Sequence, residues 1–290
     1  MGVYHFLRYP GGLCKAVTLS YDDASIHDKR LIGIIEPYGL RCTFNVPFGF
    51  LNTKGHLTTE EAAELYSDPH YEAAIHNFYH TAPGKSSYQT LAREVGDDRR
   101  ALENLFGKII CGMAYPDSGI NRVNDGKSVE EIVRLLSMLG IVYSRTTRDQ
   151  SDDERFMLPN EYLTWNPTCH HDNPRLMELV QTFLKMDVDG QYTANREPIL
   201  FYLWGHSFEF NRDDNWQVLE NFAKAVGNRD DIWYATNIEI CRYHAAYRSL
   251  VFSYDDNLVF NPSSIPVWFI KNKKHYRIDP GQTLDCTADR

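Results

Sequence analysis

The sequence predicts an α/β protein built on a parallel sheet. Short apolar runs rich in β-branched and aromatic residues alternate with longer amphipathic segments seven or eight times before about residue 250. Polar residues follow several of these runs directly, as Asp22, Asp23, His76 and His206 do. Parallel strands joined by helices bring their carboxyl ends to one edge of a sheet. We therefore expect these side chains together on one rim, whether the sheet is closed as a barrel or open and doubly wound.

The predicted strands are the apolar runs. The first, residues 16–22, ends in two adjacent carboxylates, and the most apolar one, residues 199–204, leads into Gly205 and His206. The other strands expected in the main sheet span residues 41–46, 72–75, 109–114, 141–144, 162–165 and 232–235.

The predicted helices lie between these strands and carry recognisable end signals. Thr58 with Glu61, and Ser128 with Glu131, have the spacing of a capping box at a helix start, and Gly107 is placed to end a helix. The expected helices span residues 28–39, 58–65, 87–106, 128–139, 174–186, 216–226 and 238–248.

The pattern changes at about residue 251, where short β-like runs are separated by turn residues. We predict two parts, a catalytic α/β domain over residues 1–250 and a small β-rich appendage over residues 251–290 packed on it. Residues 253–256 repeat the letters Ser-Tyr-Asp-Asp of residues 20–23, and we interpret this copy as a chance repeat in a turn.

The composition excludes several classes of protein. The chain has 290 residues, of which 43% are hydrophobic and 13% aromatic, so a disordered or fibrous protein is excluded. A net charge of -9 argues against nucleic acid or an anionic membrane as a partner. No run approaches the roughly 20 apolar residues of a membrane span. Residues 1–10 lack an apolar signal core, so we expect a cytoplasmic protein, or a secreted one if a leader was removed.

The six cysteines are scattered, and none forms a Cys-x-x-Cys pair. Their pattern predicts buried free thiols in a reducing compartment.

A metal site is predicted from Asp22, Asp23, His76 and His80. Adjacent side chains at a strand end point in different directions, so one carboxylate can bind a metal while the other takes a proton from water. Two histidines four residues apart can face one ion. One carboxylate and two imidazoles suit Zn²⁺, with Co²⁺, Ni²⁺ or Fe²⁺ as alternatives, and an open position would let the ion activate water.

His206 is expected on the same rim and is predicted to act as a general acid. The alternative is a buried histidine with a purely structural hydrogen bond. Glu209 is expected to orient His206, to contact substrate, or to be a solvated loop acid. His170 and His171 are adjacent, so we interpret them as a loop pair that does not share a ligand face.

Four motifs taken together resemble the polysaccharide deacetylase family, the NodB homology group also named carbohydrate esterase family four. The resemblance covers about residues 14–245. The motifs occur in the family's order: Tyr21-Asp22-Asp23-Ala24, His76-x3-His80, Ala114-Tyr115-Pro116-Asp117 with Gly119, and His206.

The resemblance implies a deformed (β/α) barrel of seven or eight strands and metal-dependent removal of N-acetyl groups from a sugar or oligosaccharide. By position, Asp22 is similar to the general base, and His206 to the acid that protonates the leaving amine. The backbone N–H of Asp117 is similar to the family's oxyanion donor. The metal ligands implied by the resemblance are Asp23, His76 and His80.

The chain departs from the family pattern at several positions. Ala24 stands where the first motif usually has glycine, and Ala114 where the third usually has an arginine that steadies the base. Asp117 stands where an aromatic residue often follows the proline, and the acid-plus-tryptophan motif has no clear copy. Arg145 either replaces the missing arginine or forms a surface salt bridge.

Four residues are candidates for contact with substrate: Tyr115, Trp165, Glu209 and Arg145. An aromatic ring at a strand end could stack on a sugar, although a plain core position suits Trp165 equally well.

Three alternative functions are considered. The first is hydrolysis of a small non-sugar amide in place of the sugar. A non-haem Fe(II) oxygenase also uses two histidines and one carboxylate, but it needs no second aspartate beside them. An inactive carbohydrate-binding barrel is disfavoured because both Asp22 and His206 are present.

Overall fold

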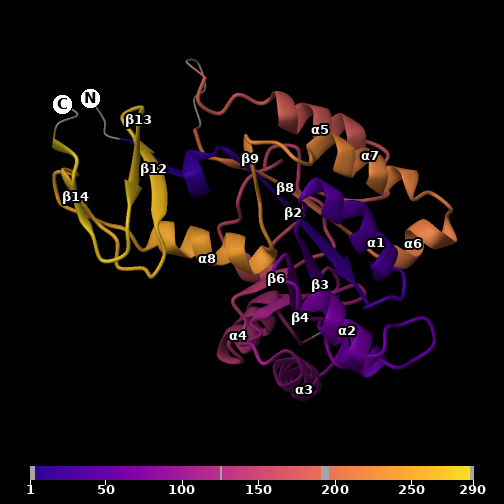
Figure 1. Cartoon of the computed structure of the whole chain (residues 1–290). Helices are drawn as coiled ribbons and strands as arrows, with labels where there is room; N and C mark the ends of the chain where they lie inside the picture. The colour runs from indigo at the N-terminus through magenta and orange to yellow at the C-terminus, as the bar shows by residue number, and fades with distance from the viewer. Residues whose placement is uncertain (1–3, 125, 191–195, 288–290) are drawn as a thin grey trace.

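The structure, a computed structural model, describes residues 4–124, 126–190 and 196–287. Its centre is a curled parallel sheet surrounded by helices, and two small antiparallel sheets lie at one end of the molecule (Figure 1). This arrangement confirms the predicted deformed (β/α) barrel with a β appendage.

The main sheet has the strand order β6-β5-β4-β3-β2-β8-β7, and β9 pairs with the first residues of β2. Its strands are β2 (Lys15–Asp22), β3 (Cys42–Val46), β4 (Tyr71–Ile75), β5 (Gly112–Ala114), β6 (Tyr143–Arg145), β7 (Cys169–His170), β8 (Ile199–Gly205) and β9 (Ile232–Tyr234). Neighbouring strands are parallel, so their carboxyl ends share one rim.

The segment over residues 165–171 connects the two edges of the curled sheet. At the β6 edge, the Trp165 N–H donates to the Ser144 carbonyl and the Thr146 N–H donates to the Trp165 carbonyl. At the opposite edge, β7 pairs with β8, and the His171 N–H just after β7 donates to the Trp204 carbonyl. The deformation of the barrel is therefore concentrated where irregular backbone replaces a regular strand.

The predicted strand over residues 162–165 is wrong for its first three residues. Tyr162–Thr164 forms a 3-10 turn, η4, and only Trp165 pairs with the sheet, opposite Arg145. The side chain of Glu161 accepts a hydrogen bond from the Leu163 N–H at 2.9 Å, which stabilises a turn in place of an extended strand.

The helices follow the predicted pattern, with the addition of the short α6. They are α1 (Asp28–Ile35), α2 (Thr59–Tyr66), α3 (Tyr88–Phe106), α4 (Val129–Met138), α5 (Leu176–Lys185), α6 (Ser207–Arg212), α7 (Gln217–Val226) and α8 (Asn237–Arg248). Both halves of the capping box before α2 are present: Glu61 N–H donates to Thr58, and Thr58 N–H donates to Glu61. α3 ends at Gly107 in the left-handed conformation, as predicted.

The first turn of α8 closes the amino end of the barrel. Asn237 is buried there, where it accepts a hydrogen bond from Thr18 Oγ1 of β2 at 2.9 Å and donates its backbone N–H to Thr43 of β3. It also donates its side-chain amide to Tyr202 of β8. Three strands are thus tied to one helix end, which leaves the opposite, carboxyl rim for a site.

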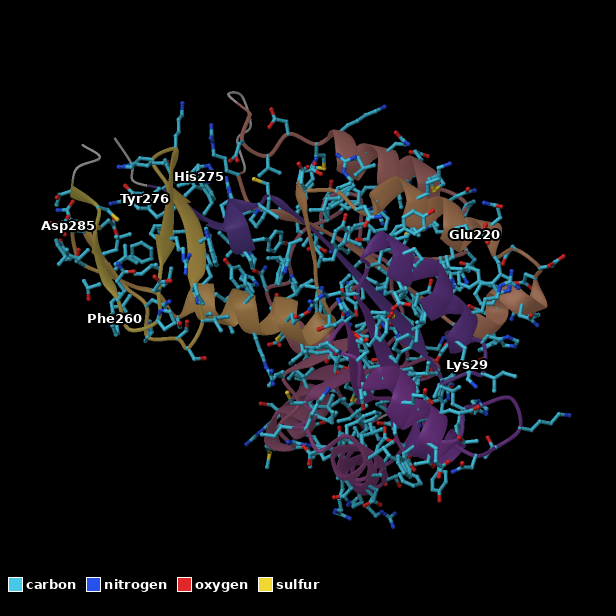
Figure 2. The ribbon with its side chains drawn as sticks, viewed as in Figure 1. Lys29, Glu220, Phe260, His275, Tyr276 and Asp285 are labelled. Carbon is cyan, nitrogen blue, oxygen red and sulfur yellow. The ribbon has the colours of Figure 1, made fainter. Side chains whose placement is uncertain are left out.

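The C-terminal residues form two small antiparallel sheets. One has the order β1-β12-β13 and the other β10-β11-β14. Their strands are β1 (His5–Arg8), β10 (Val251–Phe252), β11 (Leu258–Phe260), β12 (Val267–Lys271), β13 (Lys274–Ile278) and β14 (Thr283–Asp285). Phe260, His275 and Tyr276 mark these sheets in Figure 2, far from Lys29 on α1 and Glu220 on α7. β1 comes from the N-terminal end of the chain, and the sequence did not predict it.

All six cysteines are free thiols, and all but Cys14 are buried, which agrees with the prediction from their spacing. Among the described residues, no helix combines the length and apolar character needed to cross a membrane.

Candidate active site

Asp22 and Asp23 lie at the carboxyl end of β2, in the centre of the sheet. Asp22 is the last residue of the strand and is fully enclosed, whereas the Asp23 side chain retains 14% exposure. Asp23 has a φ of +79°, so the backbone turns sharply between the two acids. The turn separates their directions, which allows the two neighbours to have different partners.

Asp22 is held by two buried groups from other strands. Asn45 of β3 donates to its Oδ1 at 2.8 Å, and Arg145 of β6 forms an ion pair with its Oδ2. Burial raises the pKa of the Asp22 carboxyl, but Arg145 and the nearby histidines outweigh it and lower that pKa to about 2. Arg145 is itself fully buried, with its guanidinium 4.1 Å from the Trp204 ring centroid, so a surface salt bridge is excluded.

His76 and His80 face the free side of Asp23. Their Nε2 atoms lie 3.6 and 3.4 Å, respectively, from Asp23 Oδ1. His76 Nδ1 is 2.9 Å from the Ala114 carbonyl, which can only accept, so this nitrogen carries the ring proton. The lone pair of a neutral His76 is consequently on Nε2 and points toward Asp23, the tautomer expected of a metal ligand.

The side chains of Asp23, His76 and His80 have closely spaced ligand atoms, as a site for a divalent cation requires. Within the described residues, Asp23 Oδ1 and His76 Nε2 are buried and have no hydrogen-bond partner. Leaving such atoms unpaired costs about 1–3 kcal/mol each, unless something binds them. Zinc bonds of 2.0–2.2 Å in a tetrahedron place ligand atoms about 3.3–3.5 Å apart, close to the separations seen here. Asp23, His76 and His80 therefore fit a His₂Asp metal site.

Asp98 on α3 fixes the backbone of His76 from beneath. Its Oδ2 accepts the His76 N–H at 2.9 Å and its Oδ1 accepts the Phe48 N–H at 2.8 Å. Burial raises the pKa of the Asp98 carboxyl to about 8, against the effect of these two N–H donors. Asp98 was not predicted from the sequence, although an acid one turn from Val95 and Leu102 on the buried face of α3 was an available signal.

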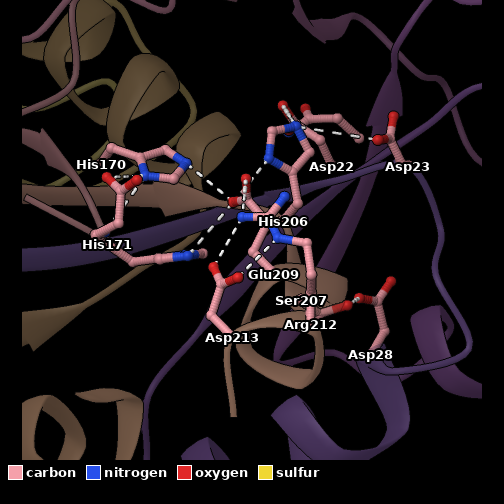
Figure 3. Close-up of polar contacts among 12 residues, drawn as sticks. Asp22, Asp23, Asp28, His170, His171, His206, Ser207, Glu209, Arg212 and Asp213 are labelled. Carbon is pink, nitrogen blue, oxygen red and sulfur yellow. Dashed lines mark hydrogen bonds and ion pairs between the residues drawn. The ribbon is translucent and has the colours of Figure 1, made fainter. Parts of the chain in front are cut away.

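His206 lies beside the two acids, just before α6 (Figure 3). Its Nε2 is 3.8 Å from Asp22 Oδ2 and 3.9 Å from Asp23 Oδ2, while its Nδ1 donates to Glu209 Oε2 at 3.1 Å. Burial lowers the pKa of His206, but Glu209 and the two aspartates outweigh it, so the pKa is raised overall. Glu209 thus orients His206, and the solvated-acid interpretation of Glu209 does not apply.

The remaining predicted residues lie away from this cluster or turn their side chains from it. Asp117 has a φ of +52° and an exposed carboxylate 3.2 Å from Lys85. Tyr115 is fully buried and donates its hydroxyl to the Leu163 carbonyl at 2.8 Å. Trp165 is fully buried among tyrosine rings. Neither ring presents a face to solvent, so both contribute packing.

Both motif loops contain non-glycine residues with positive φ angles. These are Asp23 and Ala24 after β2, and Asn77 and His80 after β4. Each left-handed residue costs of order 1–3 kcal/mol, so the surrounding contacts must hold these loops in place. Ala24, with a φ of +51°, occupies the position where the family resemblance leads one to expect glycine.

Comparison with known proteins gives matches among solved structures. No protein-family model matches the chain, and no curated protein matches its sequence. A Mycobacterium smegmatis structure provisionally described as a polysaccharide deacetylase is 18% identical, covers 83% of this chain and 94% of its own, and has a TM-score of 0.58. The structure of Puue allantoinase is 12% identical, covers 82% of this chain and 93% of its own, and has the same TM-score of 0.58.

A Streptococcus pyogenes deacetylase, PplD, solved in complex with acetate, is 20% identical over 45% of this chain, with a TM-score of 0.39. The match spans just over half, 55%, of that protein's chain. Identities this low establish architecture alone, and the chain has the deformed (β/α) barrel fold shared by the polysaccharide deacetylase and allantoinase structures.

Proposed function

We propose that this protein is a metal-dependent hydrolase that removes N-acetyl groups from a sugar or oligosaccharide. The observation that carries the proposal is the meeting, on one rim, of a His₂Asp ligand set, a second ionised aspartate and a histidine paired with a carboxylate. The shared fold with a polysaccharide deacetylase structure supports it.

Asp23, His76 and His80 would hold the metal, with zinc the best match to their donor atoms and cobalt or nickel as alternatives. When bound, such an ion would polarise the substrate carbonyl and lower the pKa of a water molecule.

Asp22 is the general base in this proposal. Arg145 and Asn45 keep its carboxylate ionised and oriented, so it can accept a proton from water at neutral pH. The water oxygen bonds to the acetyl carbon as that proton moves to Asp22. The backbone N–H of Asp117 is proposed to donate to the carbonyl oxygen as negative charge develops there.

His206 is the general acid. Its Nδ1 proton is held by Glu209, so Nε2 is the atom that faces the two aspartates. As the C–N bond breaks, Nε2 gives its proton to the leaving nitrogen. The products are acetate and the amine, which takes up the proton released by the new carboxyl group, and the proton taken up by Asp22 restores His206 through solvent.

The proposal is tested by acetate release from chitooligosaccharides with zinc- or cobalt-loaded protein. We expect Asp22→Asn to keep the metal and to lose about 10²–10⁴-fold in turnover. Asp255→Asn is the matched control, because it makes the same change in the exposed Ser-Tyr-Asp-Asp copy between β10 and β11. Metal loss from Asp22→Asn would mean that the two aspartates have exchanged roles. Sugar binding by metal-loaded wild type without acetate release would instead favour an inactive barrel.

A second candidate function is hydrolysis of a small non-sugar amide. It is favoured by the equal likeness to Puue allantoinase and by the burial of both Tyr115 and Trp165, which leaves neither ring to stack on a sugar. A panel of linear and cyclic amides on the same metal-loaded protein separates the two. Turnover of small amides but of no acetylated sugar would replace the first proposal by the second.

A further inference from the structure

A second histidine–carboxylate cluster lies on the far side of His206 from Asp23 (Figure 3). His170 ends β7, His171 follows it, and Glu209 comes from α6. The Nε2 atoms of His170 and His171 are 3.2 and 3.4 Å from the same oxygen, Glu209 Oε2. One ligand atom from each side chain lies within 4.8 Å of the other two.

The expectation that His170 and His171 would not share a ligand face is therefore wrong. Strand alternation sends neighbours to opposite faces only while the backbone stays extended. His171 is already in the turn after β7, so its ring swings to the side of His170. A Cβ on Gly205 would lie 2.0 Å from His171 Nδ1, so the glycine at the end of β8 makes the space for that ring.

The tautomer of His170 is fixed by a neighbouring carboxylate. Asp172 Oδ1 lies 2.5 Å from His170 Nδ1 and can only accept, so Nδ1 carries the proton of a neutral ring. A backbone N–H contact to the same nitrogen is longer, at 3.3 Å, and does not reverse this assignment. The Nε2 lone pair of neutral His170 thus faces the Glu209 carboxylate. The two repel unless Nε2 takes up a second proton or a metal ion lies between them.

The distances suit a metal ion in that position. The two separations from Glu209 Oε2 are close to the edge of about 3.3–3.5 Å expected for zinc bonded to nitrogen and oxygen in a tetrahedron. Asp172 accepts the Nδ1 proton of His170, as a carboxylate outside the ligand set commonly does for a metal-binding imidazole. The other oxygen of Glu209, Oε1, is 3.7 Å from Arg212, which leaves Oε2 as the ligand atom.

We propose that His170, His171 and Glu209 form a second divalent-cation site with a preference for zinc-like ions. Glu209 Oε2 is also the acceptor for His206 Nδ1 at 3.1 Å, so ion binding here and the orientation of His206 are linked through a single oxygen. The site is independent of the Asp23, His76 and His80 ligands, because it shares none of them.

The test is the number of zinc ions bound per chain in the full-length protein, measured by elemental analysis and by calorimetric titration with Zn²⁺. We expect two per chain in wild type, one in His170→Gln, one in His80→Gln and none in the double variant. His70→Gln is the matched control, because His70 also pairs with a nearby aspartate, at 2.7 Å, but lies on the surface outside both clusters. It should bind as many ions as wild type.

Cobalt absorption spectra of the same proteins provide a second measurement that needs no substrate. His170→Gln should remove part of the ligand-field absorption, and His80→Gln the rest. A wild type that binds a single ion, lost in His80→Gln and kept in His170→Gln, would overturn the second site and leave the first intact. The reverse pattern would support the second site and count against the metal site of the proposed hydrolase. Far-ultraviolet circular dichroism shows whether each variant is folded.

Discussion

At the scale of single residues, the candidate site depends on buried charges whose partners come from distant parts of the chain. Asp22 and Arg145 are 123 residues apart in sequence and form a fully buried ion pair. The guanidinium keeps the carboxylate ionised in a place where burial alone would favour the neutral acid. The chemistry of Asp22 is therefore determined as much by Arg145 as by Asp22 itself.

Arg145→Met tests this dependence. Removing the cation leaves Asp22 buried and unpaired, so we expect its pKa to rise and the free energy of unfolding to fall by about 3–5 kcal/mol at pH 7. If Asp22 is the base, the acid limb of the pH–rate profile moves to higher pH. Urea unfolding and the pH dependence of turnover measure the two effects.

Arg100→Met is the control for Arg145→Met. Arg100 pairs with Asp97 on the exposed face of α3, and such surface pairs contribute about 0–1 kcal/mol. An Arg145→Met protein as stable as Arg100→Met would show that the buried pair contributes little.

At the scale of secondary-structure elements, Glu72 links several strands to the helix that closes the barrel. Its Oε2 accepts from Thr43 of β3 and from the Ile238 N–H in the first turn of α8, and its Oε1 accepts from Tyr143 of β6. Burial raises the pKa of the Glu72 carboxyl to about 7, although these hydrogen bonds oppose the rise. Glu72 itself lies on β4, so one acid joins the amino ends of three strands to α8.

This raised pKa predicts a pH-dependent stability. The folded state holds the Glu72 proton up to about pH 7, whereas the unfolded chain loses it near pH 4.5. Between these values Glu72 is more protonated in the folded state than in the unfolded chain, so its contribution to the free energy of unfolding decreases with rising pH, by at most about 1.4 kcal/mol per pH unit. Glu72→Gln should flatten this slope, as measured by urea unfolding from pH 4.5 to 7.

Glu64→Gln, a change of the same chemistry on the exposed side of α2, is the control and should keep the wild-type slope. An unchanged slope in Glu72→Gln would show that Glu72 is already ionised in the folded protein at pH 5. Glu72→Gln need not match wild type in its absolute free energy of unfolding, because its hydrogen bonds differ. That difference is independent of pH and does not change the slope.

At the scale of the whole molecule, the N-terminal strand unites the barrel with the small C-terminal sheets. β1 pairs with β12 from His5 to Arg8, and the chain passes from β1 into β2 within a few residues. Tyr243 of α8 donates its hydroxyl to the Arg8 carbonyl at 2.7 Å and accepts the Trp268 N–H at 3.0 Å. Ala246 of α8 and Leu250, which follows the helix, are buried in the core of the small sheets.

These links predict that the full chain unfolds as one cooperative unit. Differential scanning calorimetry should show a single transition in which the calorimetric and van't Hoff enthalpies agree. Two resolved transitions would instead mean that the barrel and the sheets are independent domains, as a boundary near residue 250 would suggest.

The local sequence determined most elements and the ligands of the candidate site. Capping residues, helix-ending glycines and apolar runs depend only on nearby residues. They can therefore be recognised in the sequence alone, as at Thr58, Glu61 and Gly107. Asp22, Asp23, His76 and His206 could be grouped because parallel strands place their carboxyl ends on one rim. The strand prediction failed at residues 162–164, where the Glu161 side chain stabilises a 3-10 turn.

Only the tertiary structure decided which buried partners these residues have. Arg145 meets Asp22, Asp98 holds the His76 backbone, and Glu209 gathers three imidazoles around one oxygen. Each contact depends on how strands and helices far apart in the sequence are aligned when the sheet curls, and no local pattern encodes that alignment. The sequence by itself thus determined which side chains reach the rim, while the closure of the barrel decided their charges, tautomers and neighbours, because electrostatic partners are chosen by distance in space.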